Sequence, residues 1–547
     1  MRDTPEPQLH LWSESPATQT GAYPTESAYW RGSRASRSRT REEQKRLGQF
    51  MTPAAIARFM AERSIAGRDW GGRSVRLLDP AAGSGVLAAA LVEAILASSA
   101  RPTRIELLLC ELDPSMLPLL DTCAGELVLL CARLGVEFEC QVRRGDFLLS
   151  ALARSGHASV DAVIANPPYF KLAGSDERVH AFADAVHGQP NIYALFMASC
   201  ASLLRPGGAF CFITPRSWAN GAYFRALRAQ LLTKLSIDAL HLFDSRQSHF
   251  QADAVLQEAL IVWATAGRPQ AAVAVSSSHG ASDLPCAKPL LWPQYRVLGP
   301  APERMVTIPD ALAEQELDGL HLRLHDLGLK VSTGAVVGFR AAAHLRAEAT
   351  PTTVPMLWMP HVRSMSIEWP RQHRAEHIDA NEGSAWMLLP NQPMVLLRRF
   401  SPKEDSRRIT AAPYLGDLPG ARVGLENHLN VIHAGERRSR PNGRPGSRRD
   451  PSGGPGASRN ALHDGRPMSI DATLGLAAYL NSLPVDRYLR RLLGSTQINA
   501  IELRNLPLPD IATLEAIGRG LTAAVSIDAA VQAACRQRVP SRSTRHA

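Results

Sequence analysis

Apolar runs alternate with segments of helical periodicity between about residue 44 and residue 265. Short apolar runs bounded by turn residues are typical of buried strands, and parallel strands need crossover helices between them. The pattern therefore indicates an α/β fold with a mostly parallel sheet. The predicted strands are residues 75–79, 105–110, 136–142, 160–165, 209–213, 239–243 and 256–264, and helices are predicted at 86–97 and 193–204.

The last two predicted strands are joined differently from the others. Only Asp244 to Val255 separates them, and this segment is too short to hold a crossover helix. We expect these two strands to pair antiparallel.

The segments around this sheet have other compositions. Residues 1–43 are rich in Pro, Ser and Thr and include a basic stretch, which is typical of a disordered tail. We expect a first domain at 44–268, a linker at 269–310 and a second domain of mixed α/β pattern at 311–547. Residues 437–466 form a low-complexity Arg/Gly/Pro/Ser stretch, which predicts an insertion in the second domain.

Composition narrows the class of protein. The 547 residues carry a net charge of +10, which is compatible with a polyanionic partner, although an Arg-rich chain can also reflect the base composition of its genome. The eight cysteines form no CxxC pair, which favours reduced thiols over disulfides or zinc ligands. No apolar run predicts a membrane span and the first residues do not resemble a signal peptide, so we expect a cytoplasmic protein.

Three turns that follow predicted strands carry candidate binding residues. The segment Asp79-Pro80-Ala81-Ala82-Gly83-Ser84-Gly85 follows the first strand, and its glycines allow a ligand to approach the backbone. Glu111 follows the second strand and can accept both hydroxyls of a ribose, while Asp113 can cap the next helix. Asp146 and Phe147 follow the third strand and can bind an adenine amino group and its ring. Each turn also fits a structural role.

The fourth strand is followed by Asn166-Pro167-Pro168-Tyr169. Two prolines fix an extended backbone whose carbonyls have no part in a helix or a sheet ladder. The Asn166 side-chain carbonyl and the Pro167 main-chain carbonyl can converge on one planar NH2 group, and Tyr169 can stack on the ring that carries it. Hydrogen bonds to both hydrogens favour the tetrahedral nitrogen that attacks a methyl sulfonium.

In this order the motifs resemble the amino-group DNA methyltransferases, and in particular the gamma class of N6-adenine enzymes from bacterial restriction–modification systems. In that class a cofactor segment precedes the first strand, and residues 47–53 match it, with Thr52 and Pro53 as the start of a helix at 54–64. The resemblance spans residues 47–265. It implies a Rossmann-like S-adenosylmethionine-dependent methyltransferase sheet, S-adenosylmethionine as the cofactor and no metal.

The resemblance also implies a reaction and a role for each matching residue. The reaction is methyl transfer from S-adenosylmethionine to N6 of a flipped-out adenine in duplex DNA. The implied partners are double-stranded DNA and a separately encoded restriction endonuclease, and we expect a monomer. Asn166, Pro167 and Tyr169 are assigned to catalysis, Tyr169 and Phe250 to stacking on the base, and Thr52, Asp79, Ala81, Gly83, Glu111, Asp146 and Phe147 to the cofactor.

The second half of the chain carries less specific matches. Residues 331–338, 426–430, 494–500 and 503–509 resemble segments of target-recognition regions, so a C-terminal target-recognition domain is implied. A dense cationic cluster there could hold DNA phosphates or form a solvated surface. The cluster consists of Arg398, Arg399, Lys403, Arg407 and Arg408.

Other functions share parts of this pattern. Enzymes that methylate a protein glutamine or a ribosomal RNA base also carry Asn-Pro-Pro-Tyr, but they typically lack a large domain after the fold. A cytosine C5 enzyme would need a Pro-Cys nucleophile at the fourth strand, and Pro285-Cys286 lies outside the predicted sheet. Asn166 in place of Ser favours adenine over cytosine N4 by analogy with the family. A DNA-recognition protein built on an inactive fold is the remaining alternative.

Overall fold

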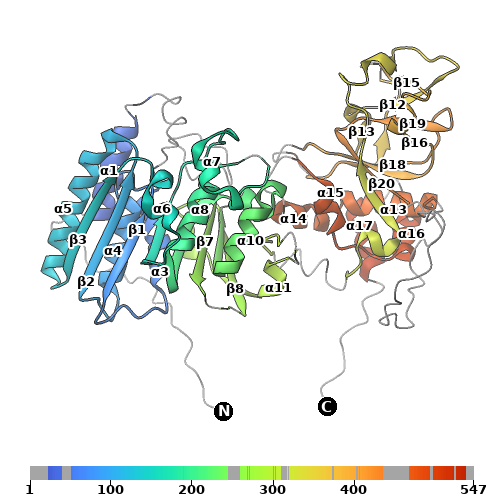
Figure 1. The fold of residues 1–547 in the computed structure, drawn as a ribbon. Coiled ribbons are helices and arrows are strands. Elements are labelled where there is room, and N and C mark those ends of the chain that lie inside the picture. The colour runs from blue at the N-terminus through green and yellow to red at the C-terminus, as the bar shows by residue number, and fades with distance from the viewer. Residues whose placement is uncertain are drawn as a thin grey trace, which may run out of the picture. The chain divides into compact units, whose positions relative to one another are not determined.

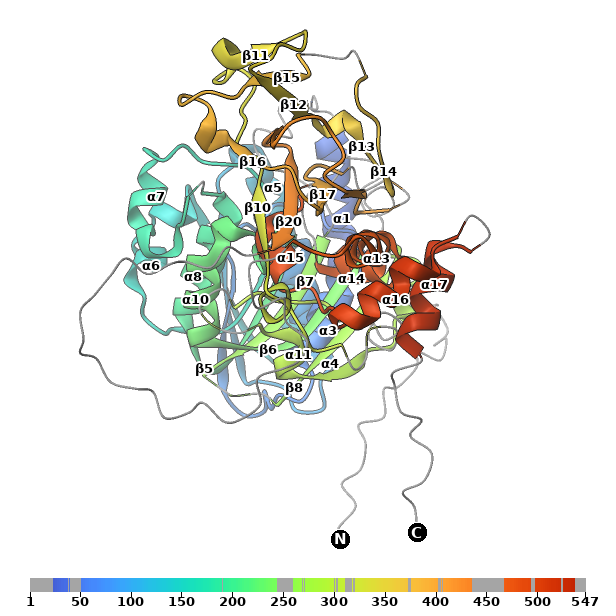
Figure 2. The same cartoon turned by 90° about the vertical axis from the view of Figure 1, so that its right-hand side faces the viewer.

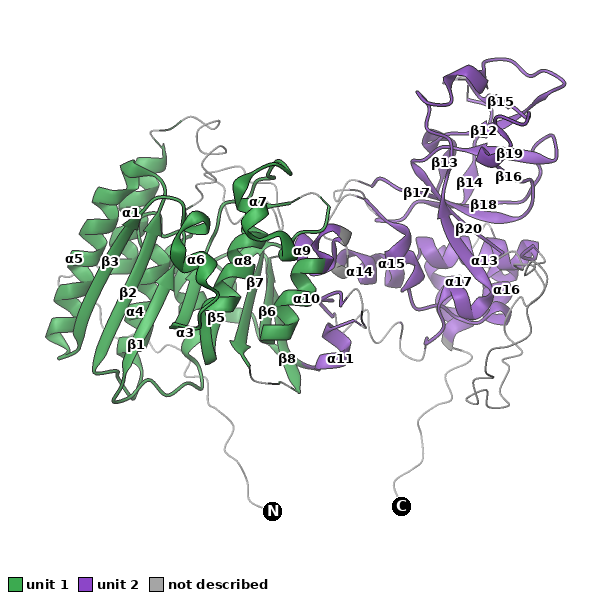
Figure 3. Ribbon diagram, viewed as in Figure 1, with its two compact units in different colours: residues 1–215, 226–291 green, residues 216–225, 292–547 purple. Residues whose placement is uncertain are grey.

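The computed structural model describes residues 23–37, 39, 51–188, 190–243, 259–267, 269, 271–299, 301, 304–309, 317, 320–371, 375–401, 405, 407–434, 467–492, 497–522 and 525–536. The chain divides into two compact units (Figure 1, Figure 3). Unit 1 comprises residues 1–215 and 226–291, and unit 2 comprises residues 216–225 and 292–547. Each unit has a hydrophobic core of its own.

A nine-stranded sheet forms the centre of unit 1. Its strands are β1 (Ser74–Asp79), β2 (Arg104–Glu111), β3 (Glu137–Arg144), β4 (Val160–Ala165), β5 (Leu204–Pro215), β6 (Leu235–Phe243), β7 (Ala259–Ala266), β8 (Ala272–Ser278) and β9 (Leu290–Pro293). Their order in space is β3-β2-β1-β4-β5-β7-β6-β8-β9. Strands β1 to β5 pair parallel, whereas β7 pairs antiparallel with both β5 and β6.

The predicted sheet is confirmed. The strand predicted at 160–165 coincides with β4, and each other predicted strand overlaps an observed one. All six residues of β4 are buried, because a central parallel strand is covered on both faces, and this makes its apolar run easy to recognise. The antiparallel pairing expected for the last two predicted strands is the β6–β7 pair, in which Leu240 lies opposite Val262.

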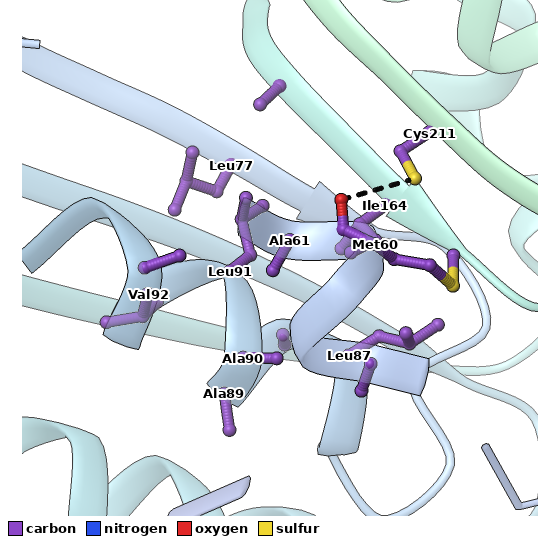
Figure 4. Close-up of a cluster of buried hydrophobic side chains, with 14 of the residues drawn as sticks. Met60, Ala61, Leu77, Leu87, Ala89, Ala90, Leu91, Val92, Ile164 and Cys211 are labelled. Atoms are coloured by element: carbon purple, nitrogen blue, oxygen red, sulfur yellow. Dashed lines mark hydrogen bonds between the residues drawn. The ribbon is translucent and has the colours of Figure 1, made fainter. Parts of the chain in front are cut away.

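Helices flank this sheet (Figure 1). They are α1 (Pro24–Arg37), α3 (Ala54–Ile65), α4 (Val86–Ala97), α5 (Leu117–Arg133), α6 (Ala151–Ser155), α7 (Glu177–Ala181), α8 (Ile192–Leu203) and α10 (Arg225–Lys234). Figure 4 shows part of the core, where Met60 of α3 and Leu91 of α4 lie near Leu77 of β1 and Ile164 of β4. The Cys211 thiol donates to the Met60 main-chain oxygen at 3.8 Å, and all eight cysteines are free.

The expected linker at 269–310 is wrong over much of its length. It contains β8, β9 and the short helix α11 (Gln294–Val297). Strand β8 pairs parallel with β6, and the Ser276 and Ser278 hydroxyls bind the two ring nitrogens of the buried His241. These buried serines interrupt the apolar run by which a strand is recognised in the sequence, so β8 was not predicted.

The expectation of a disordered tail at 1–43 is wrong for α1. Ala28 of this helix is fully buried in the core of unit 1. The Arg31 guanidinium donates to both carboxylate oxygens of Glu126 on α5, at 2.6 and 2.8 Å. A basic stretch resembles a solvated tail when its acidic partner is distant in the sequence, and this explains the error.

Helix α5 and the preceding turn η1 (Pro114–Met116) form a helical segment that is long and apolar enough to cross a membrane, the one such segment in the described parts of the chain. Its residues Leu120, Cys123 and Leu127 are fully buried in the core of unit 1. The helix packs along β3. Packing beside the sheet therefore accounts for the apolar residues on the inner face of this helix, while Val128 and Leu129 are exposed.

Unit 2 contains three small sheets built from short strands. Their orders are β10-β20-β17-β18, β11-β15-β12-β19-β16 and β13-β14. A strand of two to six residues is too short to give a clear period, so only a mixed pattern was expected here. The strands are β10 (Leu329–Thr333), β11 (Leu345–Arg346), β12 (Thr353–Leu357), β13 (Val362–Arg363), β14 (Ser366–Ile367), β15 (His377–Asp379), β16 (Leu388–Pro390), β17 (Met394–Arg398), β18 (Ala411–Tyr414), β19 (Arg422–Leu425) and β20 (Leu429–Ala434).

A group of helices completes unit 2. It includes α13 (Ile470–Asn481), α14 (Leu483–Leu492), α15 (Ala500–Arg504), α16 (Ile511–Gly520) and α17 (Ile527–Arg536), and the short helix α9 (Ser217–Asn220) also belongs to this unit. Helices α13, α16 and α17 pack on one another (Figure 2). A Cβ added at Gly475 or Gly518 would overlap the backbone of the facing helix, so these glycines permit the close approach of α13 and α16. The predicted insertion at 437–466 lies outside the described residues.

Candidate active site

An open cavity of about 920 Å³ lies at the carboxyl ends of strands β1 to β4. Its wall includes residues 80–84 after β1, Glu111 at the end of β2, residues 145–147 after β3 and Asn166 after β4. Met51 and Thr52, which precede α3, also line it. The carboxyl ends of parallel strands meet at one edge of a sheet, where α/β proteins bind ligands. Residues as far apart in the sequence as Thr52 and Asn166 therefore share one cavity.

Two glycines with left-handed backbone shape the turn after β1. Gly83 has a φ of +54° and Gly85 a φ of +90°, a conformation that is unfavourable for residues with a Cβ. A Cβ at Gly85 would also lie 2.8 Å from Cys123 Sγ on α5. The turn can therefore present its backbone to a ligand only with glycine at these positions.

Asp79 lies at the end of β1, beneath this turn. Its Oδ1 accepts the Ala81 N–H at 3.1 Å, while its Oδ2 has no hydrogen-bond partner among the described residues. The side chain is 1% exposed, and burial raises the pKa of its carboxyl to about 7. Asp79 does not line the cavity itself, so its contact with a cofactor stays a prediction.

Glu111 is held by backbone hydrogen bonds at the wall of the cavity. Its Oε2 accepts the Gly83 N–H and its Oε1 accepts the Asp113 N–H, both at 2.7 Å. Burial raises the pKa of this carboxyl. Each carboxylate oxygen can accept a further hydrogen bond, so Glu111 fits a ligand diol. Asp113 caps η1 by accepting the Ser115 N–H at 3.0 Å. The capping role that was the alternative for this segment therefore belongs to Asp113, and Glu111 is not needed for it.

Asp146 and Phe147 line the same cavity from the loop after β3. Phe147 is buried and stacks on Phe196 of α8, with ring centroids 5.6 Å apart. The Leu148 N–H donates to Asp146 Oδ1 at 2.9 Å, and Arg178 Nη1 lies 3.3 Å from Asp146 Oδ2. The arrangement offers an acceptor beside an aromatic wall.

Arg178 is a lining residue that sequence reasoning missed. It lies on α7, and its guanidinium binds Asp176 as well as Asp146, with Nη2 2.6 Å from Asp176 Oδ2. These contacts raise the pKa of Arg178, chiefly through the hydrogen bond to Asp176. No motif surrounds Arg178 in the sequence, so only its position in the fold identifies it.

Asn166 is fixed at the cavity wall by two hydroxyl groups. Its Nδ2 donates to Thr52 Oγ1 at 3.0 Å, and its Oδ1 accepts from the Tyr169 hydroxyl at 2.5 Å. The Tyr169 hydroxyl oxygen also lies 2.9 Å from the Ile213 main-chain oxygen, so its single hydrogen has two acceptors within reach. These contacts orient the Asn166 amide, whose oxygen is of a type that can accept two hydrogen bonds.

The positions of Thr52 and Tyr169 refine the roles expected of them. Thr52 was expected to start a helix, but α3 begins at Ala54 with Pro53 as its N-cap and no side-chain cap. The Thr52 hydroxyl instead binds Asn166. The Tyr169 side chain packs edge-on against Tyr193 at 6.1 Å between centroids, and burial raises the pKa of its hydroxyl above the usual range. Pro167, the residue after Asn166, is buried. Phe250 lies outside the described residues.

The cationic cluster predicted in unit 2 does not form one phosphate-binding face. Arg408 is 1% exposed and donates to the Ser401 main-chain oxygen at 2.8 Å, so its assignment to DNA phosphates is wrong. Arg407 forms an ion pair with Asp528 at 2.9 Å, and Arg398 donates to the Val362 main-chain oxygen at 2.7 Å. Partners inside the unit compete with phosphate for these side chains. The remaining members are Arg399, whose Nη1 lies 3.3 Å from the Asn427 oxygen, and Lys403, which lies outside the described residues.

Comparison with known proteins identifies related sequences and similar structures. Residues 142–250 match the model of the Eco57I restriction-modification methylase family. The chain is 31% identical over 491 residues to the type II methyltransferase M.PstI of Providencia stuartii, covering 86% of this chain and 89% of that relative. It is also 31% identical over 494 residues to the type II methyltransferase M.BsuBI of Bacillus subtilis, with the same coverage of both chains. Among solved structures, the type IIL restriction-modification enzyme MmeI in complex with DNA aligns with 94% of this chain and 76% of its own, at 11% identity and a TM-score of 0.45.

Proposed function

This chain belongs to the type II DNA methyltransferases of restriction–modification systems, and we propose that it methylates N6 of adenine in duplex DNA with S-adenosylmethionine as the methyl donor. The observation that carries this proposal is the placement of Asn166. Its amide is fixed between the Thr52 and Tyr169 hydroxyls at the wall of the cavity that Glu111 and Asp146 also line. A hydrogen-bond acceptor for an amino group therefore lines the same cavity as the residues assigned to the cofactor, with the exception of Asp79.

The cavity residues fit the adenosine part of S-adenosylmethionine. Glu111 accepts the two ribose hydroxyls, Asp146 accepts the adenine amino group, and Phe147 packs on the ring. The main chain of Ala81 and Gly83 lies against the cofactor at the turn that left-handed glycines shape. When bound, the cofactor supplies an electrophilic methyl group on a cationic sulfur.

The target amino group is bound by Asn166 and Pro167. The Asn166 Oδ1 and the Pro167 carbonyl oxygen accept its two hydrogens, which draws the nitrogen lone pair out of the ring and toward the methyl group. Catalysis is positioning and lone-pair localisation, without a covalent enzyme intermediate. The hydrogen bonds from Asn166 to Thr52 and from Tyr169 to Asn166 keep the amide in one orientation, so little reorganisation is needed at the moment of reaction.

Access to a base in a duplex requires that the base leaves the stack. Extrusion costs a few kcal/mol, and stacking on Tyr169 and Phe250 offsets that cost. Unit 2 acts as the target-recognition domain that grips the duplex. The protein works as a monomer in the cytoplasm, beside a separately encoded endonuclease that cuts the same site when it is unmethylated.

The test is methylation-sensitive long-read sequencing of DNA from cells that express the protein or its Asn166→Ala variant. We expect N6-methyladenine at one short motif in the first sample and none in the second. Methylation at cytosine N4 would overturn the choice of base. Unmodified DNA from a folded, cofactor-binding protein would favour the alternatives, which are methylation of ribosomal RNA or of a protein glutamine, or an inactive-fold recognition protein.

A further inference from the structure

Helix α1 is anchored to unit 1 by contacts that none of the assigned roles uses. The Thr25 N–H and hydroxyl donate to the two carboxylate oxygens of Glu93 on α4, at 2.9 and 2.8 Å. The Arg31 guanidinium binds Glu126 on α5 through two hydrogen bonds. A bidentate guanidinium–carboxylate pair fixes both distance and orientation. The helix is therefore held against α4 through Thr25 and against α5 through Arg31.

The inner face of α1 contacts two residues of the cavity wall. Ala28 and Gly32 are one helical turn apart, so they lie on the same face. The buried Ser84 hydroxyl donates to the Ala28 main-chain oxygen at 2.9 Å. A Cβ added at Gly32 would overlap the Ser84 hydroxyl and lie 2.7 Å from Met51 Sδ. Ser84 and Met51 both line the cavity, so α1 sets the position of the wall from behind.

Arg39, which follows α1, contacts the segment that holds Glu111. The Arg39 guanidinium forms an ion pair with Asp113 at 2.6 Å and a hydrogen bond to the Ser115 hydroxyl. Asp113 in turn donates its main-chain N–H to Glu111 Oε1. Helix α1 thus lies against the glycine-rich turn and Met51 of the cavity wall, and Arg39 binds Asp113, which in turn holds the wall residue Glu111.

We propose that α1 is a structural part of the cofactor site, with Gly32 and Ala28 as positioning residues that hold the Ser84 turn and Met51 in their binding arrangement. The inference rests on the proposed function, because it takes the cavity to be the S-adenosylmethionine site. It assigns to the N-terminal segment a role in cofactor affinity. The residues assigned to the amino group are Asn166 and Pro167, and the nearest described link from α1 to them runs through Met51 to its neighbour Thr52, whose hydroxyl binds Asn166. Displacement of the cavity wall should therefore change the affinity for the cofactor more than the rate at saturating cofactor.

The experiment compares Gly32→Val with Arg34→Val in the full-length protein. Both create the same β-branched residue on α1, but Gly32 is buried against Ser84 and Arg34 is exposed. We expect Gly32→Val to raise the Kd and KM for S-adenosylmethionine about 10-fold or more, because small displacements of a binding wall are costly. Its kcat at saturating cofactor should stay within about twofold of that of Arg34→Val. Equal cofactor affinity of the two variants would overturn the proposal, as would a fall in kcat with unchanged KM.

A second pair of variants covers the case in which Gly32→Val does not fold. One of the two loosens α1 without a steric clash, and the other is its control. Arg31→Met removes the bidentate pair with Glu126, and Arg37→Met changes an exposed arginine of the same helix. Arg31→Met should raise the cofactor KM above that of Arg37→Met, in the same direction as Gly32→Val. An unchanged KM would overturn the proposal. Absence of cofactor binding by the unmodified protein would instead overturn the proposed function, so the two failures are distinguishable.

Discussion

The cavity of unit 1 and the arginine-rich segment 398–408 of unit 2 differ in how distance along the sequence relates to distance in space. Thr52, Glu111 and Asn166 are far apart in the sequence, yet they line one cavity. Arg398, Arg407 and Arg408 are close in the sequence, yet their side chains bind different partners. The cavity residues lie where parallel strands end at one edge of a sheet, whereas Arg398 ends β17 and Arg407 and Arg408 lie in the loop before β18, so the three arginines have no common direction. The position of a residue on the sheet therefore predicts a site better than local charge density does.

The largest expected effect tests the cavity side of this comparison. Asn166→Ala should lower the single-turnover rate of methyl transfer to a DNA duplex about 10²- to 10³-fold, the usual loss when one preorganised hydrogen-bonding group is removed. The Kd for the cofactor should stay nearly unchanged, because Glu111 and Asp146 remain. Calorimetry provides this control. A variant that reacts at the wild-type rate would remove Asn166 from the reaction.

The next effect tests the arginine segment. Arg408→Ala should lower the free energy of unfolding by about 3 kcal/mol, because it leaves a cavity and removes the hydrogen bond to the Ser401 carbonyl. Arg407→Ala is the control, since its ion pair with Asp528 is one-third exposed and contributes less than about 1 kcal/mol. Denaturant titration measures both changes. If Arg408→Ala instead left stability unchanged and lowered the salt dependence of DNA binding, the arginine would be a phosphate contact after all.

A pH titration tests a buried charge of unit 1. Asp79 has a pKa of about 7 in the folded protein, raised by burial from an ordinary 3.8. The folded state therefore holds this proton more tightly than the unfolded state does, and the contribution of Asp79 to stability is lost as the pH rises from about 4 through 7. Asp79→Asn removes this loss, so the stability of the variant relative to wild type should increase over that range. Parallel stability curves for the two proteins would contradict the burial argument.

Much of unit 1 could be predicted because central strands such as β4 and β7 are buried along their whole length and the ends of β1 to β4 carry the motifs. Helix α1 could not, because the charge of Arg31 is balanced by Glu126, which no local pattern connects to it. Strand β8 was missed because Ser276 and Ser278 pair with His241 inside the sheet. In each case a polar residue has a partner that is remote in the sequence, and single-sequence patterns carry no information on such pairs.

A smaller effect compares two acids on one strand. Glu111→Gln should raise the Kd for the cofactor about 10- to 100-fold, because a hydrogen bond to a charged group contributes about 1.5–3 kcal/mol. The amide also cannot accept on both sides, so it disturbs the Gly83 and Asp113 contacts. Glu106→Gln is the control on the same strand, where Glu106 pairs with Arg76 at 2.7 Å. Equal affinities of the two variants, measured by calorimetry, would leave Glu111 without its assigned role.

The smallest effect concerns Arg178, the cavity residue that the fold alone identifies. Arg178→Met should raise the KM for the cofactor only about threefold, because its contact with Asp146 is 3.3 Å long and partly exposed to solvent. The Leu148 N–H still orients Asp146 in the variant, so kcat should not change. Arg154→Met, on the exposed side of α6, is the matched control. A KM equal to that of the control would mean that the main-chain contact at the sheet edge positions Asp146 by itself. A large fall in kcat would instead place Arg178 near the reacting amino group, and the site would then extend beyond the strand ends that define it here.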